Sequence, residues 1–322
     1  MSSLPDPGHD LEFLCKIAEG QSASVYRVYN NKYQLHYAAK VIQIPPDREK
    51  DILAQYNNEV QALHAINHPN VVRLYNFFRE ESNFYLVFED CSGGNLEILL
   101  ELGQNISMPQ LQTAAFQIVQ AVDACHRANY AHCNINPSNI LFDSHDRPKL
   151  CDFRSAVTPM NQMVSFTAQK SLYYIAPEEF MKKPYDPSKA DIWALGITLY
   201  YMASGTYPWS GTQESELLSN IQNHPISYPS SIPQDLQLSI GRMLRVDPSK
   251  RPTTEHILRD QFFLNAAKTI TSQATTSRRL SKQPNLTTLS KLKGSIADSG
   301  NRMRRKSGGQ SLVMKFPKNI LD

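Results

Sequence analysis

The chain contains 322 residues, of which 41% are hydrophobic and 20% are charged, and its formal net charge is +3. These values are typical of an ordinary globular protein. Its five cysteines are scattered without a CxxC pair, which argues against a disulfide framework and a structural zinc site and favours a reducing, intracellular setting, either cytoplasmic or nuclear.

Membrane insertion is not expected from this sequence. The longest strongly apolar stretch, residues 192–203, is shorter than the roughly 20 residues that a spanning helix needs, so we interpret it as a buried helix. The first ten residues have no basic head and no apolar run, and we therefore expect no secretory signal.

Residues 11–90 are predicted to form a small strand-rich unit with a single helix. Residues 24–44 and 83–90 alternate in the manner of strands, with β-branched and aromatic residues at a spacing of two. Residues 49–66 have helical periodicity. The apolar residues expected on one face of this helix are Leu53, Tyr56, Val60 and Leu63.

A turn near Gly20 joins the first two predicted strands. Small residues in such a turn let backbone N–H groups approach phosphates closely. Only Gly20 is a glycine, and Ala18 and Ala23 fill the flanking positions. An ordinary hairpin is therefore the alternative interpretation, and for this segment taken alone it is the preferred one.

Lys40 lies in an apolar strand and should point to the half-buried face that Ala38 also faces. A lysine at such a position needs a counter-charge. Glu59, on the only predicted helix of this unit, is an available partner. The alternative is an ordinary surface lysine that contacts no ligand.

Residues 95–264 are predicted to be mostly helical. Helices are expected at residues 108–128, 189–203, 213–222, 234–245 and 253–259. Two short strands, at residues 139–143 and 148–153, surround a polar turn.

This strand pair brings two oxygen-bearing side chains to one end of a ribbon. Asn139 ends a loop where the first strand begins, and Asp152 ends the second strand. Magnesium binds carboxylate, amide and water oxygens beside phosphates, so these two residues are candidate metal ligands. The alternative is that both side chains only cap turns.

Residues 265–322 carry 12 Lys and Arg against 2 Asp and Glu, whereas the rest of the chain carries 21 against 28. Ser, Thr and basic residues dominate this segment with little periodicity, so we expect a disordered tail. Basic clusters precede Ser281 and Ser307 and suit phosphorylation by enzymes with an acidic substrate pocket. The alternatives are that the tail contacts an anionic membrane surface or an acidic protein, or that it has no function of its own.

Taken in order, several stretches resemble the eukaryotic protein-kinase domain from about Phe13 to Phe263. They include AAK, HPNVVRLYNFF, FYLVFEDCSGGNL, NPSNILF, CDF, APEE, YDPSKADIWALGITLYYMASGTYPW and DPSKRPT. The segments CSGGNL and KADIWALGITLYYM are similar to those of the calcium/calmodulin-dependent and AMP-activated serine/threonine kinases. The resemblance implies an α+β, two-lobed fold. A small β-rich N-lobe with one main helix (11–90) would precede a larger helical C-lobe (91–264), with an extension at residues 1–10.

The resemblance also implies a site for ATP and magnesium. Lys40 would contact the α- and β-phosphates and pair with Glu59. Phe88 would lie behind the adenine, and Asn139 and Asp152 would hold the metal. The residues that it places around the nucleotide are Ala18, Gly20, Ala23, Val25, Ala38, Lys40, Glu59, Phe88, Glu89, Cys91, Asn95 and Leu141. Glu89 and Cys91 would offer backbone groups to the base.

The resemblance gives roles to four further positions. Glu178 would pair with Arg251 beneath the activation segment, and Asp191 would brace the catalytic loop. Ser171 lies where the family is often phosphorylated.

Four positions depart from the family at the chemistry. Asn134 stands where the family has its catalytic aspartate, and an amide can orient a hydroxyl but is not a useful base. Asn136 replaces the lysine that steadies the transferring phosphoryl group, and Cys133 replaces the arginine that grips a phosphorylated activation segment. Arg154 replaces the glycine two residues after Asp152. It would either bring positive charge near the phosphates, or point to solvent or pair with an acidic neighbour.

The sequence therefore predicts a pseudokinase that binds ATP, transfers phosphate poorly and serves as a scaffold or allosteric partner in signalling. The first alternative is a serine/threonine kinase with weak or unconventional catalysis, because Lys40, Asn139 and Asp152 are present. The second is an interaction module without nucleotide, in which Arg154 fills the site. No nucleic-acid partner is expected, and the sequence identifies no protein partner or substrate.

Overall fold

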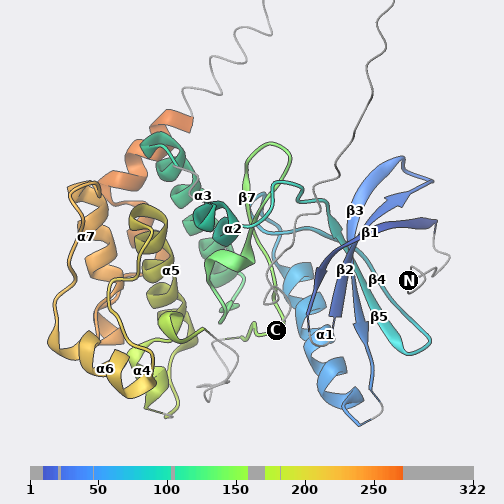
Figure 1. Cartoon of the computed structure of the whole chain (residues 1–322), viewed down its shortest axis with the longest axis horizontal. Helices are drawn as coiled ribbons and strands as arrows, with labels where there is room; N and C mark the ends of the chain where they lie inside the picture. Colours follow the sequence, from blue (N-terminus) through green and yellow to red (C-terminus); the bar gives the residue numbers. More distant parts are fainter. Residues whose placement is uncertain are drawn as a thin grey trace, which may run out of the picture.

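The computed structural model describes residues 10–20, 23–45, 47–102, 106–158, 171–181 and 183–270. A sheet-containing lobe and a helical lobe lie side by side (Figure 1). The α+β, two-lobed arrangement expected from the sequence is therefore confirmed. The basic clusters before Ser281 and Ser307 lie outside the described residues.

The N-lobe is a five-stranded antiparallel sheet in the order β1-β2-β3-β5-β4. Its strands are β1 (Leu11–Glu19), β2 (Ala23–Asn30), β3 (Leu35–Gln43), β4 (Leu74–Glu80) and β5 (Asn83–Glu89). Side chains along each strand alternate between its two faces. On β3, Tyr37, Ala39 and Val41 belong to an apolar cluster on one face, whereas Ile42 belongs to the main core on the other. This alternation directs Lys40 to the face of the sheet that α1 covers.

Helix α1 (Glu49–Ala65) packs on that face of the sheet (Figure 1). Its buried stripe contains Ile52, Tyr56 and Val60 at successive spacings of four, as one face of a helix requires. The prediction that Leu53 lies on this buried face is wrong. Leu53 is 37% exposed, whereas Ile52 is 4% exposed. The buried stripe continues from Tyr56 to the residue four positions earlier, which is Ile52. Leu53 therefore lies beside the stripe and faces solvent.

The C-lobe is built mainly from helices. They are α2 (Leu96–Glu101), α3 (Met108–Arg127), α4 (Pro177–Phe180), α5 (Pro187–Ser204), α6 (Glu214–Asn223), α7 (Gln234–Met243) and α8 (Thr254–Leu258). Short 3-10 turns are η1 (Pro137–Asn139), η3 (Leu172–Tyr174) and η4 (Pro248–Lys250). The predicted long and medium helices are confirmed to within a few residues, whereas α2 and α4 were not expected.

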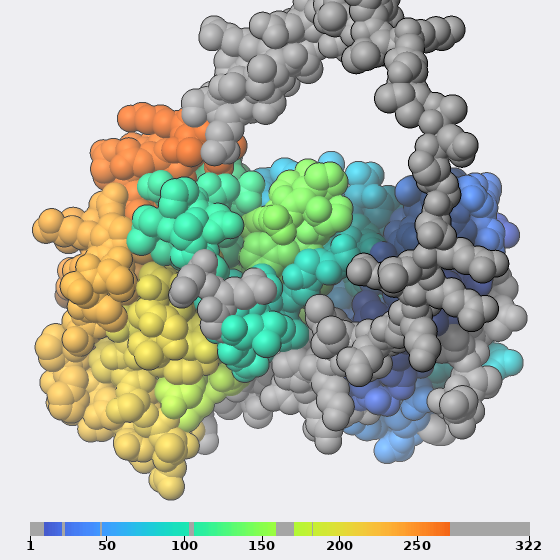
Figure 2. Space-filling view, turned by 45° about the horizontal axis from the view of Figure 1, so that its top comes forward, coloured from blue at the N-terminus to red at the C-terminus, as the bar shows by residue number. Residues whose placement is uncertain are grey.

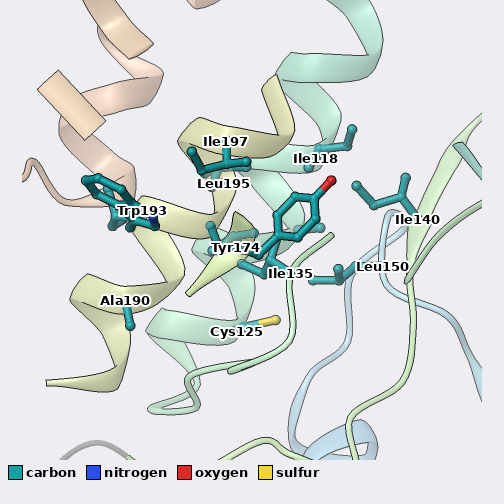
Figure 3. Close-up of a cluster of buried hydrophobic side chains, with 14 of the residues drawn as sticks. Ile118, Cys125, Ile135, Ile140, Leu150, Tyr174, Ala190, Trp193, Leu195 and Ile197 are labelled. Carbon is teal, nitrogen blue, oxygen red and sulfur yellow. The ribbon is translucent and has the colours of Figure 1, made fainter. Parts of the chain in front are cut away.

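Helix α5 lies at the centre of the C-lobe and is buried on nearly all sides, which confirms the buried helix predicted at residues 192–203. Figure 3 shows Trp193, Leu195 and Ile197 of this helix among side chains from α3 and the loop before β6. The Trp193 ring stacks on Trp209 with centroids 5.6 Å apart. No helix in the described part of the chain is long and apolar enough to cross a membrane.

A two-stranded antiparallel hairpin, β6 (Ile140–Phe142) and β7 (Pro148–Leu150), connects the lobes. The Val72 N–H of the N-lobe donates to the Leu150 carbonyl at 2.9 Å, and the Asn70 side chain donates to the Pro148 carbonyl at 2.9 Å. The hairpin turn reaches the surface between the lobes (Figure 2). These bonds place the ends of β6 and β7, with Asn139 and Asp152, beside the N-lobe sheet.

The C-lobe extends further than the sequence predicted. Residues 261–270 are helical, and Phe262, Phe263 and Ala266 are buried in the C-lobe core or beside it. The predicted start of the tail at residue 265 is therefore too early, because this helix continues to residue 270 to bury its apolar side chains. Residues 271–322 lie outside the described part of the chain.

Candidate functional site

A cleft lies between the N-lobe sheet and the β6–β7 hairpin. Its empty volume is about 830 Å³, which includes space open to solvent. The predicted residues that line it are Ala18, Val25, Ala38, Lys40, Glu59, Phe88, Glu89, Cys91, Asn95, Leu141 and Asp152. The structure therefore brings most of the predicted site residues into one cavity.

Some residues of the site differ from the expected set. Gly20, Ala23 and Asn139 do not line the cleft, although Ala23 borders a small hollow next to Lys40. Sequence reasoning missed four lining residues, which are Ile17, Val72, Gly94 and Cys151. Three of them are neighbours in the chain of a predicted site residue, and that adjacency is a signal that could have identified them. Val72 enters from the segment before β4, and no local signal indicated it.

Lys40 of β3 and Glu59 of α1 form a buried ion pair, as the sequence predicted. The Lys40 Nζ lies 2.8 and 3.1 Å from the two carboxylate oxygens of Glu59. Their side chains are 5% and 1% exposed, so neither charge has water as an alternative partner. The pair holds an ammonium group at the inner end of the cleft, 3.7 Å from Asp152 Oδ1.

The segment from Phe88 to Asn95 forms the edge of the cleft that adjoins the C-lobe. The Glu89 carboxylate accepts from Lys149 Nζ at 2.7 Å and from the Arg73 N–H at 2.8 Å. Burial and the charge of Glu89 raise the pKa of the Cys91 thiol to about 12, so this thiol is neutral. Glu89 and Cys91 would therefore offer a ligand mainly their backbone groups.

Asn95 combines a structural role with an unsatisfied donor. Its Oδ1 accepts from the Ile98 N–H at 2.8 Å and so caps the start of α2. Its Nδ2 is buried and has no hydrogen-bond partner within the described residues. Buried donors are rarely left without a partner, which makes this amide an exception among the described residues.

The three asparagines of the loop before β6 form one hydrogen-bonded group. Asn136 Nδ2 donates to the carbonyl and to Oδ1 of Asn134, both at 3.1 Å. Asn136 Oδ1 accepts from the Ser138 N–H at 3.0 Å and caps the turn η1. Asn139 Nδ2 donates to the Asn134 carbonyl at 2.9 Å. The two positions that would carry a base and a cation in the family thus hold uncharged amides that bind each other.

Asp191 of α5 braces this loop, as the resemblance implied. Its carboxylate accepts from the backbone N–H groups of His132 and Cys133 at 2.7 and 2.8 Å, and lies 3.0 Å from His126 Nε2. Burial acts to raise the pKa of Asp191, but its hydrogen bond with His126 and the nearby histidine charges hold that pKa below its ordinary value. The loop backbone is therefore anchored by a carboxylate that stays ionised.

Arg154 pairs with the predicted metal ligand Asp152. Its Nε lies 2.7 Å from Asp152 Oδ1 and its Nη2 lies 3.0 Å from Oδ2. Of the alternatives weighed from the sequence, the structure shows pairing with an acidic neighbour. Burial acts to raise the pKa of Asp152, but Arg154 and Lys40 hold it well below its ordinary value. The backbone of Asp152 has φ of 65°, which a non-glycine residue adopts only where surrounding contacts hold it.

The remaining predicted pair lies below the cleft in the C-lobe. The Arg251 guanidinium contacts both Glu178 oxygens, at 2.6 and 2.7 Å, and thereby joins α4 to the segment before α8. Ser171 is exposed and precedes η3, and its expected phosphorylation stays a prediction. Residues 159–170, which lead up to it, lie outside the described part of the chain.

The chain matches the family model of the protein kinase domain over residues 11–263. Sperm motility kinase Z of Mus musculus is 30% identical over 214 residues, which cover 66% of this chain and 43% of that protein. Aurora/IPL1-related protein kinase 2 of Caenorhabditis elegans is 28% identical over 280 residues, which cover 86% and 90%. CBL-interacting serine/threonine-protein kinase 15 of Arabidopsis thaliana is 28% identical over 253 residues, which cover 77% and 59%. The match thus spans less than half of the mouse relative and about three fifths of the plant one.

Proposed function

Because the chain belongs to the protein kinase family, we propose that it binds ATP in the cleft beneath its N-lobe sheet but transfers the γ-phosphate inefficiently. It acts as a pseudokinase, a scaffold or allosteric partner whose conformation responds to the nucleotide. The segments CSGGNL and KADIWALGITLYYM favour a place near the calcium/calmodulin-dependent and AMP-activated kinases.

The observation that carries the proposal is the contact between Asn134 and Asn136. A general base must accept a proton, and a neutral amide does not do so at any pH used in a cell. Asn136 also has no charge to offer a transferring phosphoryl group, and its side chain is committed to Asn134 and to the cap of η1. General-base assistance alone is worth about 10²–10⁴-fold in rate, so both losses together favour very slow transfer.

Nucleotide binding is supported by the cleft itself. The Lys40–Glu59 pair positions an ammonium group for phosphates, and apolar side chains above and below the cleft suit an adenine ring.

Magnesium accompanies ATP in the family in general, and Asn139 and Asp152 were its predicted ligands. Both Asp152 oxygens are paired with Arg154, and Asn139 is turned toward the Asn134 carbonyl. The described residues contain no group of three or more His, Cys, Asp or Glu that could hold a metal ion, so a cation here would depend on Asp152. The residues in this arrangement do not fit a magnesium ion, and the proposal depends on none.

Two measurements test the proposal. Thermal unfolding of the full chain with increasing ATP should show a rise in Tm, since a ligand that binds only the folded state stabilises it. The rate of phosphate transfer by the wild type should not exceed that of Asp152→Ala. The double variant Asn134→Asp, Asn136→Lys measures how much transfer rate the two amides cost. Robust wild-type transfer that disappears in Asp152→Ala would support the active serine/threonine kinase instead. No Tm shift at millimolar ATP would leave only the interaction module.

A further inference from the structure

The carboxylate of Asp152 lies between two cations of this chain. Arg154 contacts both of its oxygens in the forked, side-by-side geometry that makes guanidinium–carboxylate pairs strong. Lys40 Nζ lies 3.7 Å from Oδ1. The exposed fractions of the Arg154 and Asp152 side chains are only 12% and 8%, so water competes little for either group. The negative charge on which a metal ion would rely is therefore already neutralised.

Among the described residues, the charged groups paired at the inner end of the cleft carry no net charge. Lys40 and Arg154 contribute two positive charges, and Glu59 and Asp152 contribute two negative ones. A divalent cation placed on Asp152 would meet the guanidinium at close range, and it would have to separate a buried, doubly hydrogen-bonded pair. With the glycine usual in the family at position 154, the same cluster would carry one net negative charge and would attract a cation.

Arg154 does not line the main cleft itself. It borders a small hollow together with Lys40, Ala23 of β2 and Gln55 of α1. Lys40 borders both this hollow and the main cleft. A phosphate that approaches Lys40 therefore comes near the guanidinium, which Asp152 holds in place.

We propose that the cleft binds its adenine nucleotide without a divalent cation, and that Arg154 supplies the fixed positive charge that a metal ion would otherwise bring. This inference rests on the proposed nucleotide site. It makes the metal-free polyphosphate the preferred ligand, because a nucleotide that carries magnesium has less negative charge to offer Lys40 and Arg154. Asp152 becomes a positioning residue for Arg154 in place of a metal ligand.

Calorimetric titration of the full chain with ATP tests the inference. The ionic strength is held constant, because salt screens contacts between phosphate and cationic side chains. In EDTA the wild type should bind ATP with a Kd no higher than in excess Mg²⁺. Arg154→Gly should weaken binding in EDTA roughly tenfold or more, the effect of losing one charge-assisted contact. In that variant Mg²⁺ should restore binding, because Asp152 is then free to accept it.

A matched control is Arg147→Gly. Arg147 pairs with Asp143 through its Nε and Nη2, both at 2.7 Å, on the hairpin turn outside the cleft. This variant loses an arginine–aspartate pair whose arginine is more exposed, 50% against 12% for Arg154, and it should keep the wild-type Kd for ATP in EDTA and in Mg²⁺. If Arg154→Gly does not fold, Arg154→Gln removes the charge with less change in backbone freedom.

Direct metal binding gives a readout that is independent of activity. The spectrum of Mn²⁺ in electron paramagnetic resonance should show no ATP-dependent bound ion in the wild type and about one in Arg154→Gly. Wild-type ATP binding that requires Mg²⁺, or one bound Mn²⁺ per wild-type chain with ATP, would overturn this inference and leave the proposed nucleotide site intact. Absence of ATP binding in both EDTA and Mg²⁺ would overturn the proposed function as well.

Discussion

The two terminal nitrogens of Arg251 donate to separate carboxylate oxygens of Glu178, 73 positions earlier in the chain, at 2.6 and 2.7 Å. The Arg251 side chain is fully buried, and its Nε also donates to the Arg245 carbonyl at 2.8 Å. Its guanidinium lies 5.1 Å from the centroid of the Trp193 ring. One arginine thus connects α4, α5 and the segment before α8.

Arg251→Met should lower the free energy of unfolding by about 3–5 kcal/mol, because it leaves the Glu178 carboxylate with no ion-pair partner in a largely buried position. Urea unfolding measures this loss. The control is Arg259→Met, which breaks the exposed pair with Glu255 and should cost at most about 0.5 kcal/mol. Equal losses in the two variants would show that the Glu178–Arg251 pair does not anchor the C-lobe.

Lys40→Met should abolish most of the ATP-induced rise in Tm, because it removes the ammonium group at the inner end of the cleft. It should also destabilise the free protein by about 3–5 kcal/mol, since Glu59 then stays buried without a counter-charge. Thermal unfolding with and without ATP measures both effects. Lys149→Met is the control, because it breaks another largely buried Lys–Glu pair whose lysine does not line the cleft. That variant should lose stability but keep its ATP response, and the opposite result would contradict the assignment of Lys40.

Acid should destabilise the protein partly through Asp191. Its pKa is held below the ordinary value in the folded state, so its contribution to stability is present above about pH 4, the unfolded value, and is lost as the pH falls toward the folded pKa. Asp191→Asn should be less stable at neutral pH, because the N–H groups of His132 and Cys133 lose a charged acceptor. The free energy of unfolding of this variant should also fall less steeply between pH 5 and about pH 3. A slope unchanged from that of the wild type would exclude Asp191 as a contributor.

Gly196→Ala should cost about 1–3 kcal/mol of stability, because the new methyl group would overpack the contact between α5 and the end of α7. Its Cβ would lie 2.9 Å from Leu244 Cδ2 and 3.0 Å from Met243 Cβ. Gly241→Ala on α7 is the comparison, because its Cβ would meet only the Tyr228 hydroxyl, at 3.3 Å. Helix propensity favours that second change by up to about 1 kcal/mol. Urea unfolding should therefore rank Gly241→Ala above Gly196→Ala, and the reverse order would contradict close packing at position 196.

The Lys40–Glu59 pair was predictable because two local periodicities converge on it. Alternation along β3 assigns Lys40 to the face of the sheet that also carries Ala38. The helical period of α1 places Glu59 on the same stripe as Tyr56 and Val60. Each of these two periodicities extends over a few residues only, so it can be recognised in a single sequence. Val72 in the cleft had no such signal, since its position depends on hydrogen bonds with the β6–β7 hairpin.

The sequence by itself determined the two lobes, the positions of most helices and strands, and the loss of charge at Asn134 and Asn136. Those properties depend on residue types and short spacings. Only the tertiary structure decided that Asn136 binds Asn134 and caps η1, and that Arg154 neutralises Asp152. The partner that a side chain binds depends on the distance to each candidate and on burial. These distances and this burial exist only once β6, β7 and α1 have packed against the sheet.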